Sequence, residues 1–340
     1  MTQTLPEPPR RAARKTMRAA VVTAPQKMEV VDAAVPEPKP GQLLVRIEGC
    51  GVCASNVPPW EGREWFKYPL APGQLGHEGW GVVEGVGPGV TGFAAGDRVA
   101  MISNNAYAAY DVADASAAVK LPANLDGQPF PAEPLGCAVN IFRRAEIRAG
   151  QTVAILGIGF LGALLTKLAR NAGARVIAVS RRPFSLDFAR RFGAHEVIPM
   201  DDHWKIVNRV AELTDGSGGY DVKGFCDCVI ECVGKEWPLQ LAGELCGVRG
   251  RLVVAGYHQD GMRSVNVQLW NWRGLDVINA HERFPTVYLE GMRTAADLVA
   301  RGDVDPRPLF THQFPLERLG EALEMTRQRP DGFMKALVRM

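Results

Sequence analysis

The hydrophobic positions along the chain fall into two different patterns. Between Met17 and about Lys120, short apolar runs such as 43–53 and 80–87 are separated by breaks rich in proline and glycine, for example 36–42. Short apolar runs bounded by turn residues are typical of strands. This part of the chain is therefore predicted to form a mainly-β domain.

From about Leu135 onward, runs of strand length alternate with helical patterns. Alternating strands and helices predict an α/β fold with a doubly wound parallel sheet. The last part of the chain returns to helices followed by a final strand at 333–340. The expected strands are 151–157, 175–180, 195–200, 226–234 and 251–256, and the expected helices are 138–147, 160–173, 183–193, 238–246, 286–302 and 316–329.

The chain has 340 residues, which is too many for one small core and suits two domains of ordinary size. Its first residues are rich in proline and arginine and have no apolar run. We therefore expect a disordered leader at 1–16, a mainly-β domain at 17–139 and a sheet domain at 140–280. Residues 281–340 are expected to return to the first domain.

Charge and cysteine content exclude several classes of protein. The formal net charge is +2, and much of the positive excess lies in the leader. The remainder is close to neutral, so we expect no binding to nucleic acid or to an anionic membrane. No apolar run is long enough to span a bilayer. Seven cysteines, an odd number at low density, favour a reducing cytoplasm over a secreted disulfide scaffold.

A glycine-rich loop follows the strand at 151–157 and opens the next helix. Gly157, Gly159 and Gly162 have the spacing GxGxxG. The first glycine allows a tight turn, the second allows close approach of a pyrophosphate, and the third allows the helix to pack on the strand. The loop is predicted to bind a dinucleotide, although a glycine-rich turn without a ligand is the alternative.

The end of the following strand indicates which dinucleotide is bound. NAD-binding proteins carry an acid here that binds the ribose 2′-hydroxyl. This chain has Ser180, Arg181 and Arg182 instead. An acid would repel a 2′-phosphate, whereas arginine binds one. We expect NADP(H), with NAD(H) less favoured; the alternative is two solvated arginines and no discrimination between the cofactors.

Potential metal ligands stand at three places in the first half of the chain. Cys53 follows an apolar strand, His77 and Glu78 follow a loop rich in proline and glycine, and Glu133 precedes the sheet domain. Thiolate, imidazole and carboxylate are the ligands that zinc uses in proteins. Taken singly, a cysteine in a β domain is more often core, and a His-Glu pair in a loop is more often polar surface.

The order of four motifs resembles the medium-chain dehydrogenase/reductase family over nearly the whole chain after about Met17. The motifs are GCGVCASN, GHEGWGVVEGVGPGVTGFAAGDRV, EPLGCAVN and GIGFLG. The resemblance implies a Rossmann sheet domain plus a GroES-like catalytic domain. It also implies that Cys53 and His77 bind a catalytic zinc. Glu78 and Glu133 match carboxylates that serve sorbitol- and threonine-dehydrogenase-like members as a ligand or as holders of the zinc-bound water.

The resemblance carries further implications for single residues. Glu133 is favoured as third ligand in place of a second cysteine, with Cys137 as its rival. Ser55 matches a hydroxyl that passes the alcohol proton outward, and Lys335 matches a basic residue that reaches the cofactor pyrophosphate. Asn56 stands where an aspartate usually braces the zinc-binding histidine.

The cysteine-rich lobe that holds a second, structural zinc in many members has no counterpart here. A single catalytic zinc is therefore expected. The family also implies a homodimer or homotetramer.

Together these features predict a zinc-dependent oxidoreductase that moves hydride between NADP(H) and a secondary alcohol or ketone. Aromatic and amide side chains favour a polyol or a sugar-derived alcohol as substrate. The alternatives are a zinc-free quinone or enone reductase of the same fold and a non-catalytic NADPH-binding protein. The residues that could line the substrate pocket are Trp60, Trp65, Asn104, Tyr107, Trp270 and His281.

Overall fold

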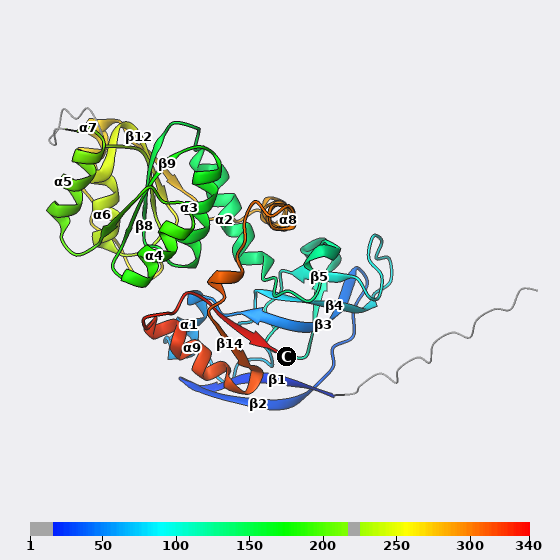
Figure 1. Cartoon of the computed structure of the whole chain (residues 1–340). Coiled ribbons are helices and arrows are strands. Elements are labelled where there is room, and N and C mark those ends of the chain that lie inside the picture. The colour runs from blue at the N-terminus through cyan, green and yellow to red at the C-terminus, as the bar shows by residue number, and fades with distance from the viewer. Residues whose placement is uncertain (1–15, 217–224) are drawn as a thin grey trace, which may run out of the picture.

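The computed structural model describes residues 16–216 and 225–340. Most of the predicted leader thus lies outside the described residues. The described chain forms two lobes, each built around a sheet, with the chain crossing between them (Figure 1).

The first lobe contains a six-stranded sheet in the order β10-β9-β8-β11-β12-β13, and every pairing in it is parallel. Alternate residues of the central strands face two different cores. Val153 and Ile155 of β8 pack with helices α2, α3, α4 and α8, whereas Ala154 and Leu156 pack with α5 and α6. Both faces are therefore covered, which confirms the predicted doubly wound sheet. The strands are β8 (Thr152–Leu156), β9 (Arg175–Ser180), β10 (Glu196–Pro199), β11 (Cys226–Glu231), β12 (Cys246–Val254) and β13 (Asp276–Asn279).

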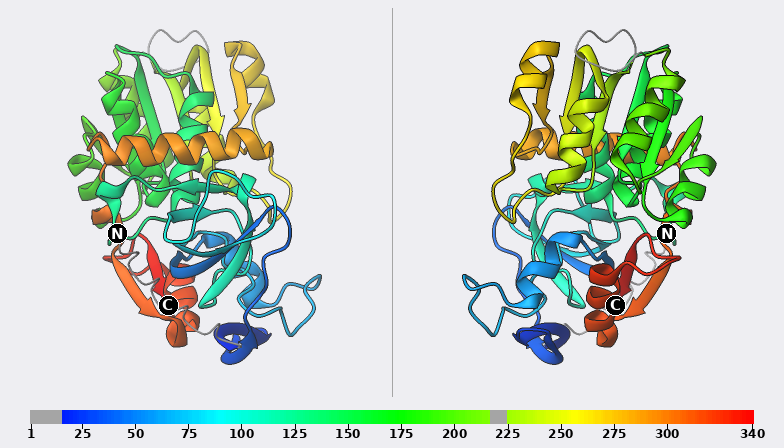
Figure 2. Two further views of the ribbon diagram at one scale, coloured as in Figure 1. Left: turned by 90° about the vertical axis from the view of Figure 1, so that its right-hand side faces the viewer. Right: turned by 90° about the vertical axis from the view of Figure 1, so that its left-hand side faces the viewer.

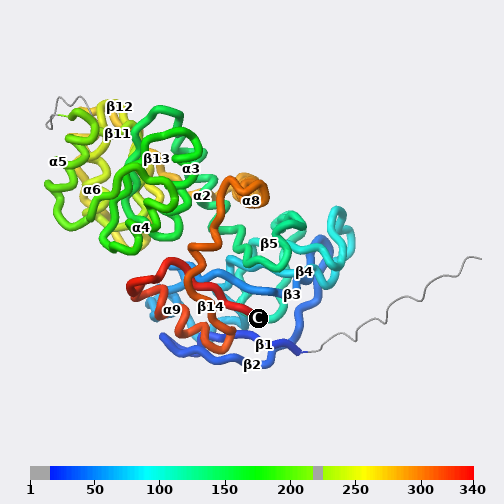
Figure 3. Tube along the Cα trace, viewed as in Figure 1, coloured from blue at the N-terminus to red at the C-terminus, as the bar shows by residue number. Residues whose placement is uncertain are grey.

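The second lobe contains the mixed sheet β14-β15-β3-β4-β5-β7, with β6 also paired to β3, and a separate hairpin of β1 and β2. The last strand, β15, pairs with β3, and β14 pairs with β15, so the end of the chain completes the domain that the start of the chain began (Figure 3). The strands are β1 (Thr16–Ala24), β2 (Lys27–Ala34), β3 (Gln42–Gly51), β4 (Gly79–Val86), β5 (Arg98–Met101), β6 (Tyr110–Asp114), β7 (Ala118–Lys120), β14 (His312–Pro315) and β15 (Ala336–Arg339).

Two long helices, α2 and α8, join the lobes and pack against each other. Figure 2 shows α8, in orange, running across the molecule between the two sheets. The helices are α1 (Val57–Glu61), α2 (Ala132–Ala145), α3 (Phe160–Asn171), α4 (Pro183–Arg191), α5 (His203–Leu213), α6 (Glu236–Leu245), α7 (Val267–Arg273), α8 (Pro285–Ala300) and α9 (Leu319–Gln328).

The structure corrects several predicted element boundaries. The helix expected at 138–147 begins at Ala132, because Pro134 lies in its first turn, where proline is tolerated. Helices α5 and α7 were not predicted. Helix α5 begins at an N-cap, Asp202, whose carboxylate accepts a hydrogen bond from the backbone N–H of Lys205 at 2.8 Å.

In the part of the chain that the structure describes, no helix has both the length and the apolar character needed to cross a bilayer.

Candidate active site and metal centre

Three potential metal ligands converge at one end of the catalytic sheet. The donor atoms of Cys53, His77 and Glu78 all lie within 4.8 Å of one another, and they form the one such group of three among the described residues. Cys53 follows β3, and the His-Glu pair precedes β4. The two strands are antiparallel neighbours with Cys50 opposite Gly79, so the end of one strand meets the start of the other.

A buried asparagine connects the two loops that carry these ligands. The Asn56 Oδ1 atom accepts hydrogen bonds from the backbone N–H of Cys53 at 3.1 Å and from the Tyr107 hydroxyl at 2.9 Å. Its amide nitrogen donates to the carbonyl oxygen of Leu75 at 2.9 Å. Asn56 therefore fixes the Cys53 loop relative to the His77 loop, and it lies 3.3 Å from His77 Nδ1 as well.

The same carbonyl of Leu75 orients His77. It lies 3.1 Å from His77 Nδ1, and the amide nitrogen of Asn56 lies 3.3 Å from the same ring nitrogen. When Nδ1 carries its proton and donates it to this carbonyl, the other ring nitrogen can offer its lone pair to a metal. Leu75 has a φ of +83°, a conformation that is costly for a leucine. That strained residue presents its carbonyl to both side chains.

The cluster carries an excess of negative groups. Burial lowers the pKa of His77, but the adjacent Cys53 sulfur and the carboxylates of Glu133 and Glu78 outweigh burial and raise it to about 10. The surroundings of His77 therefore favour a positive charge. A divalent cation satisfies the same preference.

Glu78 is fully buried and pairs with a buried lysine. The ammonium of Lys335 lies 2.6 Å from the Glu78 carboxylate and donates to the carbonyl of Val52 at 3.2 Å. The same ammonium also lies 2.6 Å from Oε2, so it faces both carboxylate oxygens. Lys335 was predicted to reach the cofactor pyrophosphate. Such a contact would compete with the ion pair that the structure contains.

Glu133 and Cys137, the two rivals for the third ligand, lie outside the three-residue cluster. They occupy neighbouring turns of α2, with the thiol of Cys137 3.5 Å from Glu133 Oε1. The hydroxyl of Tyr288, from α8, donates to the same carboxylate oxygen and lies 3.2 Å from the Cys137 sulfur. Burial and the Glu133 charge raise the pKa of Cys137 well above its ordinary value. The structure thus brings Glu78, rather than either rival, into the cluster.

Ser55 lies beside the candidate metal ligands. Its hydroxyl is 3.2 Å from the sulfur of Cys53, in the 3-10 turn that follows that residue. Of the residues expected to line the substrate pocket, Trp60 and Tyr107 are buried and Trp65 is 68% exposed. Tyr107 supports the cluster through Asn56, a role that the sequence did not indicate.

The glycine loop begins directly after β8, and its third glycine lies within α3. Gly157 has a φ of +92°, and a Cβ there would lie 2.6 Å from a methyl group of Val233. A Cβ at Gly162 would lie 2.2 Å from the carbonyl oxygen of Gly157, so this glycine is needed for the helix to pack on the turn. A Cβ at Gly159 would meet nothing within 4 Å, so the helix N-terminus opens onto free space.

The residues after β9 differ in their surroundings. Ser180 is buried, and Arg181 is exposed and makes no hydrogen bond or ion pair with the described residues. Arg182 is partly buried, and its guanidinium donates to the carbonyl oxygen of Phe333 at 2.7 Å. The two arginines predicted to bind the 2′-phosphate are therefore not equivalent.

A buried acid, Glu231, lies at the end of β11. Glu231 accepts hydrogen bonds from the backbone N–H groups of Val233 and Gly234 at 2.7 and 2.8 Å. Its second oxygen lies 2.8 Å from His258 Nε2. The carboxylate thus ties together the loops after β11 and β12, at the carboxyl edge where doubly wound sheets bind their ligands. The acid and the histidine stand 27 residues apart in the chain, so their pairing carried no local signal.

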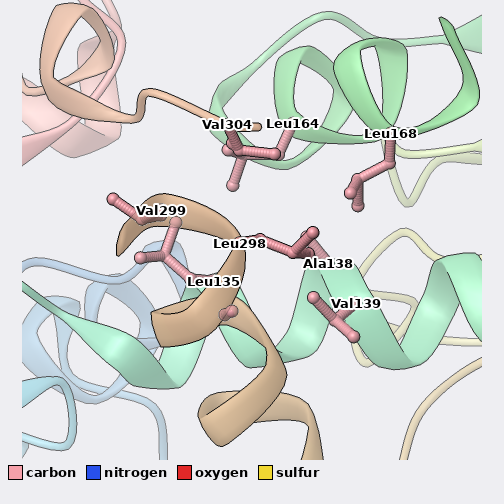
Figure 4. A pocket seen from close by; sticks show the side chains of 9 residues that line it. Leu135, Ala138, Val139, Leu164, Leu168, Leu298, Val299 and Val304 are labelled. Carbon is pink, nitrogen blue, oxygen red and sulfur yellow. The ribbon is translucent and has the colours of Figure 1, made fainter. Parts of the chain in front are cut away.

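A separate apolar pocket lies where α2, α3 and α8 meet. Figure 4 shows aliphatic side chains from these helices lining it, among them Leu135, Leu164 and Leu298. Its lining offers no donor atom for a metal and no charge for a polar substrate. The pocket is a packing feature rather than a candidate site.

Comparison with known proteins assigns the family. Residues 39–127 match the alcohol dehydrogenase GroES-like domain, and residues 161–292 match the zinc-binding dehydrogenase domain. The chain belongs to the zinc-dependent, alcohol dehydrogenase-like members of the medium-chain dehydrogenase/reductase family. It is an α/β oxidoreductase with a GroES-like domain and a Rossmann-like sheet, as the resemblance implied.

Relatives of the family align along almost the whole chain. A 2-dehydro-3-deoxy-L-galactonate 5-dehydrogenase of Pseudoalteromonas atlantica is 28% identical over 95% of this chain and 98% of its own length. Human sorbitol dehydrogenase is 27% identical over 92% of this chain and 93% of its own length. Among solved structures, a zinc-binding dehydrogenase of Sinorhizobium meliloti bound to NADP is 26% identical, with a TM-score of 0.82 over 96% of this chain and 100% of its own.

Proposed function

We propose that this chain is a zinc-dependent dehydrogenase that interconverts a secondary alcohol and a ketone with NADP(H). The observation that carries the proposal is the convergence of Cys53, His77 and Glu78 within 4.8 Å. One sulfur, one nitrogen and one oxygen donor, with a position left for substrate, suit a catalytic zinc rather than a structural one.

These three residues would hold the metal, and the chain has already oriented them. Asn56 and the Leu75 carbonyl support Cys53 and His77, and Lys335 supports Glu78. When bound, zinc supplies Lewis-acid polarisation of the substrate oxygen, and the nicotinamide accepts or delivers hydride. Zinc-free reductases of this fold do not need such a donor set, which argues against that alternative.

Two nearby polar groups are placed to serve the substrate. Ser55 lies within hydrogen-bonding reach of Cys53 Sγ and would relay the proton that the alcohol loses, accepting it while its own hydroxyl proton passes outward. Glu133 is buried beside the cluster, where its pKa is raised by burial and by the charge of Glu78. It would hold the polar group that occupies the open position, while Tyr288 and Cys137 restrain its own motion.

The cofactor would bind along the glycine loop. The tight turn at Gly157 and the open space at Gly159 fit a pyrophosphate at the N-terminus of α3. The absence of an acid after β9 and the free guanidinium of Arg181 favour NADP(H) over NAD(H). The Sinorhizobium meliloti relative bound to NADP supports this preference.

A polyol or sugar-derived alcohol is the proposed substrate class. Two of the relatives described above are dehydrogenases of sorbitol and of a deoxy sugar acid. The exposed Trp65 offers an aromatic face on which a sugar can stack.

The test combines metal analysis with a substrate screen. Purified protein is expected to contain one zinc per chain and to lose turnover on chelation. Among polyols, sugar acids and simple alcohols offered with each nicotinamide, polyols or sugar acids with NADP⁺ are expected to give the highest kcat/KM. Full activity without metal would revive the quinone or enone reductase, and a metal-bound protein that turns over nothing would favour a non-catalytic binding protein. A preference for simple aliphatic alcohols would contradict the substrate class.

A further inference from the structure

Arg182 reaches out of the cofactor sheet toward the other domain. It is the N-cap residue of α4 and the second residue after β9. Its Nη1 atom donates to the carbonyl oxygen of Phe333 at 2.7 Å, and the carbonyl oxygens of Arg329 and Pro330 lie 3.5 and 3.4 Å away. All three carbonyls belong to the segment 329–335, which joins α9 to β15 in the catalytic domain.

The remaining part of the guanidinium is also engaged. Nη2 lies 3.9 Å from the sulfur of Met334. The pKa of Arg182 is lowered, mainly because the guanidinium is partly buried. A guanidinium has five donors in a fixed fork and can satisfy several carbonyls from one position. Arg181, its neighbour, is exposed and has no hydrogen bond or ion pair with the described residues. The two side chains are therefore suited to different tasks.

The other end of the segment 329–335 is bound to Glu78, one of the three candidate metal ligands. The backbone N–H groups of Met334 and Lys335 donate to Thr311 Oγ1 at 2.9 and 3.4 Å. The ammonium of Lys335 then binds the Glu78 carboxylate. Only one residue separates Phe333, held by the cofactor domain, from Lys335, held by the candidate metal ligand.

We infer that Arg182 is a positioning residue that tethers the cofactor sheet to the segment 329–335 and thereby holds Lys335 against Glu78, whereas Arg181 alone contacts the cofactor 2′-phosphate. Domains joined by a modest interface move relative to one another unless specific contacts restrain them. Through this tether the cofactor domain is mechanically connected to the metal site. The part that concerns Arg181 rests on the proposed NADP(H) function, and the part that concerns Arg182 does not.

The test compares two neighbouring substitutions on the zinc-loaded enzyme, Arg181→Ala and Arg182→Ala, by calorimetric titration with NADPH and NADH. Arg181→Ala is expected to lower the affinity for NADPH by about tenfold to a hundredfold, which is the range for a lost hydrogen bond to a charged group. The affinity for NADH should be unchanged. Arg182→Ala is expected to lower the affinity for NADPH and the affinity for NADH by the same factor. Arg190→Ala, on the same helix, is the control and should match the wild type, because among the described residues Arg190 pairs only with Asp187.

A second readout reports on the metal site directly. The visible spectrum of cobalt-substituted protein depends on the geometry of the ligands around the metal. Arg182→Ala is expected to shift that spectrum, whereas Arg181→Ala is expected to leave it as in the wild type. If the alanine variant does not fold, Arg182→Lys takes its place. Lysine keeps the charge, but its side chain ends one bond short of the position from which Nη1 contacts the three carbonyls, so the tether predicts equal losses of affinity for both nucleotides and a shifted spectrum.

If the Arg182 variants lose affinity for NADPH but not for NADH, and the cobalt spectrum is unchanged, Arg182 is a phosphate ligand and the tether is overturned. Wild-type behaviour of both Arg182 variants in both measurements would overturn it as well. If the wild type itself does not prefer NADPH, the proposed cofactor preference fails, and the cobalt spectrum still decides the tether.

Discussion

The metal cluster and the turn after β9 are held in place to very different degrees. Each of the three clustered ligands is buried or half-buried and is supported by side chains from other parts of the chain, such as Asn56 and Lys335. The cofactor turn ends in Arg181, an exposed side chain without a partner among the described residues. One region is preorganised by the fold, and the other is completed only by its ligand.

This difference follows from the chemistry that each region serves. A catalytic metal needs fixed donors in a protected place, because misplaced or hydrated ligands lose the geometry on which polarisation depends. A 2′-phosphate needs only complementary charge near the surface, which one or two guanidiniums can supply. Substitutions in the two regions should therefore have effects of different size and kind.

The largest effect is expected for Cys53→Ala. Loss of the thiolate should remove the metal and lower kcat/KM by about a thousandfold or more, the scale of Lewis-acid stabilisation worth several kcal/mol. NADPH affinity should stay near normal, because the glycine loop is on the other domain. The checks are zinc analysis, steady-state kinetics and nucleotide titration.

Cys50→Ala provides the matched control. Cys50 lies in β3, three residues before Cys53, but it is fully buried and lies outside the cluster. This variant should retain zinc. Retained turnover in Cys53→Ala, or loss of zinc in the control alone, would contradict the site assignment.

Lys335→Met should chiefly affect stability. It leaves the Glu78 carboxylate buried without its partner, which costs about 3–5 kcal/mol in the free energy of unfolding. A metal bound by Glu78 compensates that charge, so the loss should be smaller in the zinc-loaded protein than in the metal-free protein. Urea unfolding of both forms measures the difference. Equal losses in the two forms would indicate that Glu78 is not a ligand.

Tyr288→Phe should have an intermediate effect. Removing the hydroxyl takes a hydrogen bond from the buried Glu133 and should cost about 1–3 kcal/mol of stability. Because Glu133 is then less restrained, KM for the substrate should rise more than zinc affinity falls. Cys137→Ala, which leaves the hydrogen bond between Tyr288 and Glu133 in place, is the comparison variant. If Cys137→Ala loses zinc and Tyr288→Phe does not, Cys137 is a ligand after all.

The smallest effect is expected from salt. Because Arg181 is exposed, its attraction for a 2′-phosphate is screened by dissolved ions. Raising the salt concentration should therefore weaken NADPH binding, by roughly a few-fold between 0.05 and 0.5 M, and weaken NADH binding less. Nucleotide titrations at the two ionic strengths provide the measurement. The same salt dependence for both nucleotides would place the phosphate away from an exposed charge.

Much of the fold could be predicted because its signals are local. Strand-length apolar runs and the loop at Gly157 identify the doubly wound sheet, since each needs only its own few residues. The expected start of α2 was six residues late; the helix begins at Ala132, and Pro134 lies in its first turn, where proline is compatible with a helix. That error hid the fact that Glu133 and Cys137 share one face of a helix.

The details of the candidate site depend on contacts between distant segments. Tyr288 binds Glu133 across 155 residues of sequence, and Lys335 binds Glu78 across 257. The packing of α2 against α8 places Glu133 beside Tyr288 and outside the cluster. No local sequence pattern indicates that contact. The residue types of the site were therefore predictable, and the choice between Glu78 and Glu133 was not.

The central claim is that the metal is bound by one sulfur from Cys53 together with nitrogen and oxygen donors. X-ray absorption spectroscopy at the zinc edge of the purified enzyme tests it most directly. The account predicts one sulfur at about 2.3 Å and the remaining donors at about 2.0–2.2 Å. Two sulfurs around the metal would contradict it, because the second could come only from a cysteine such as Cys137 that the structure holds outside the cluster.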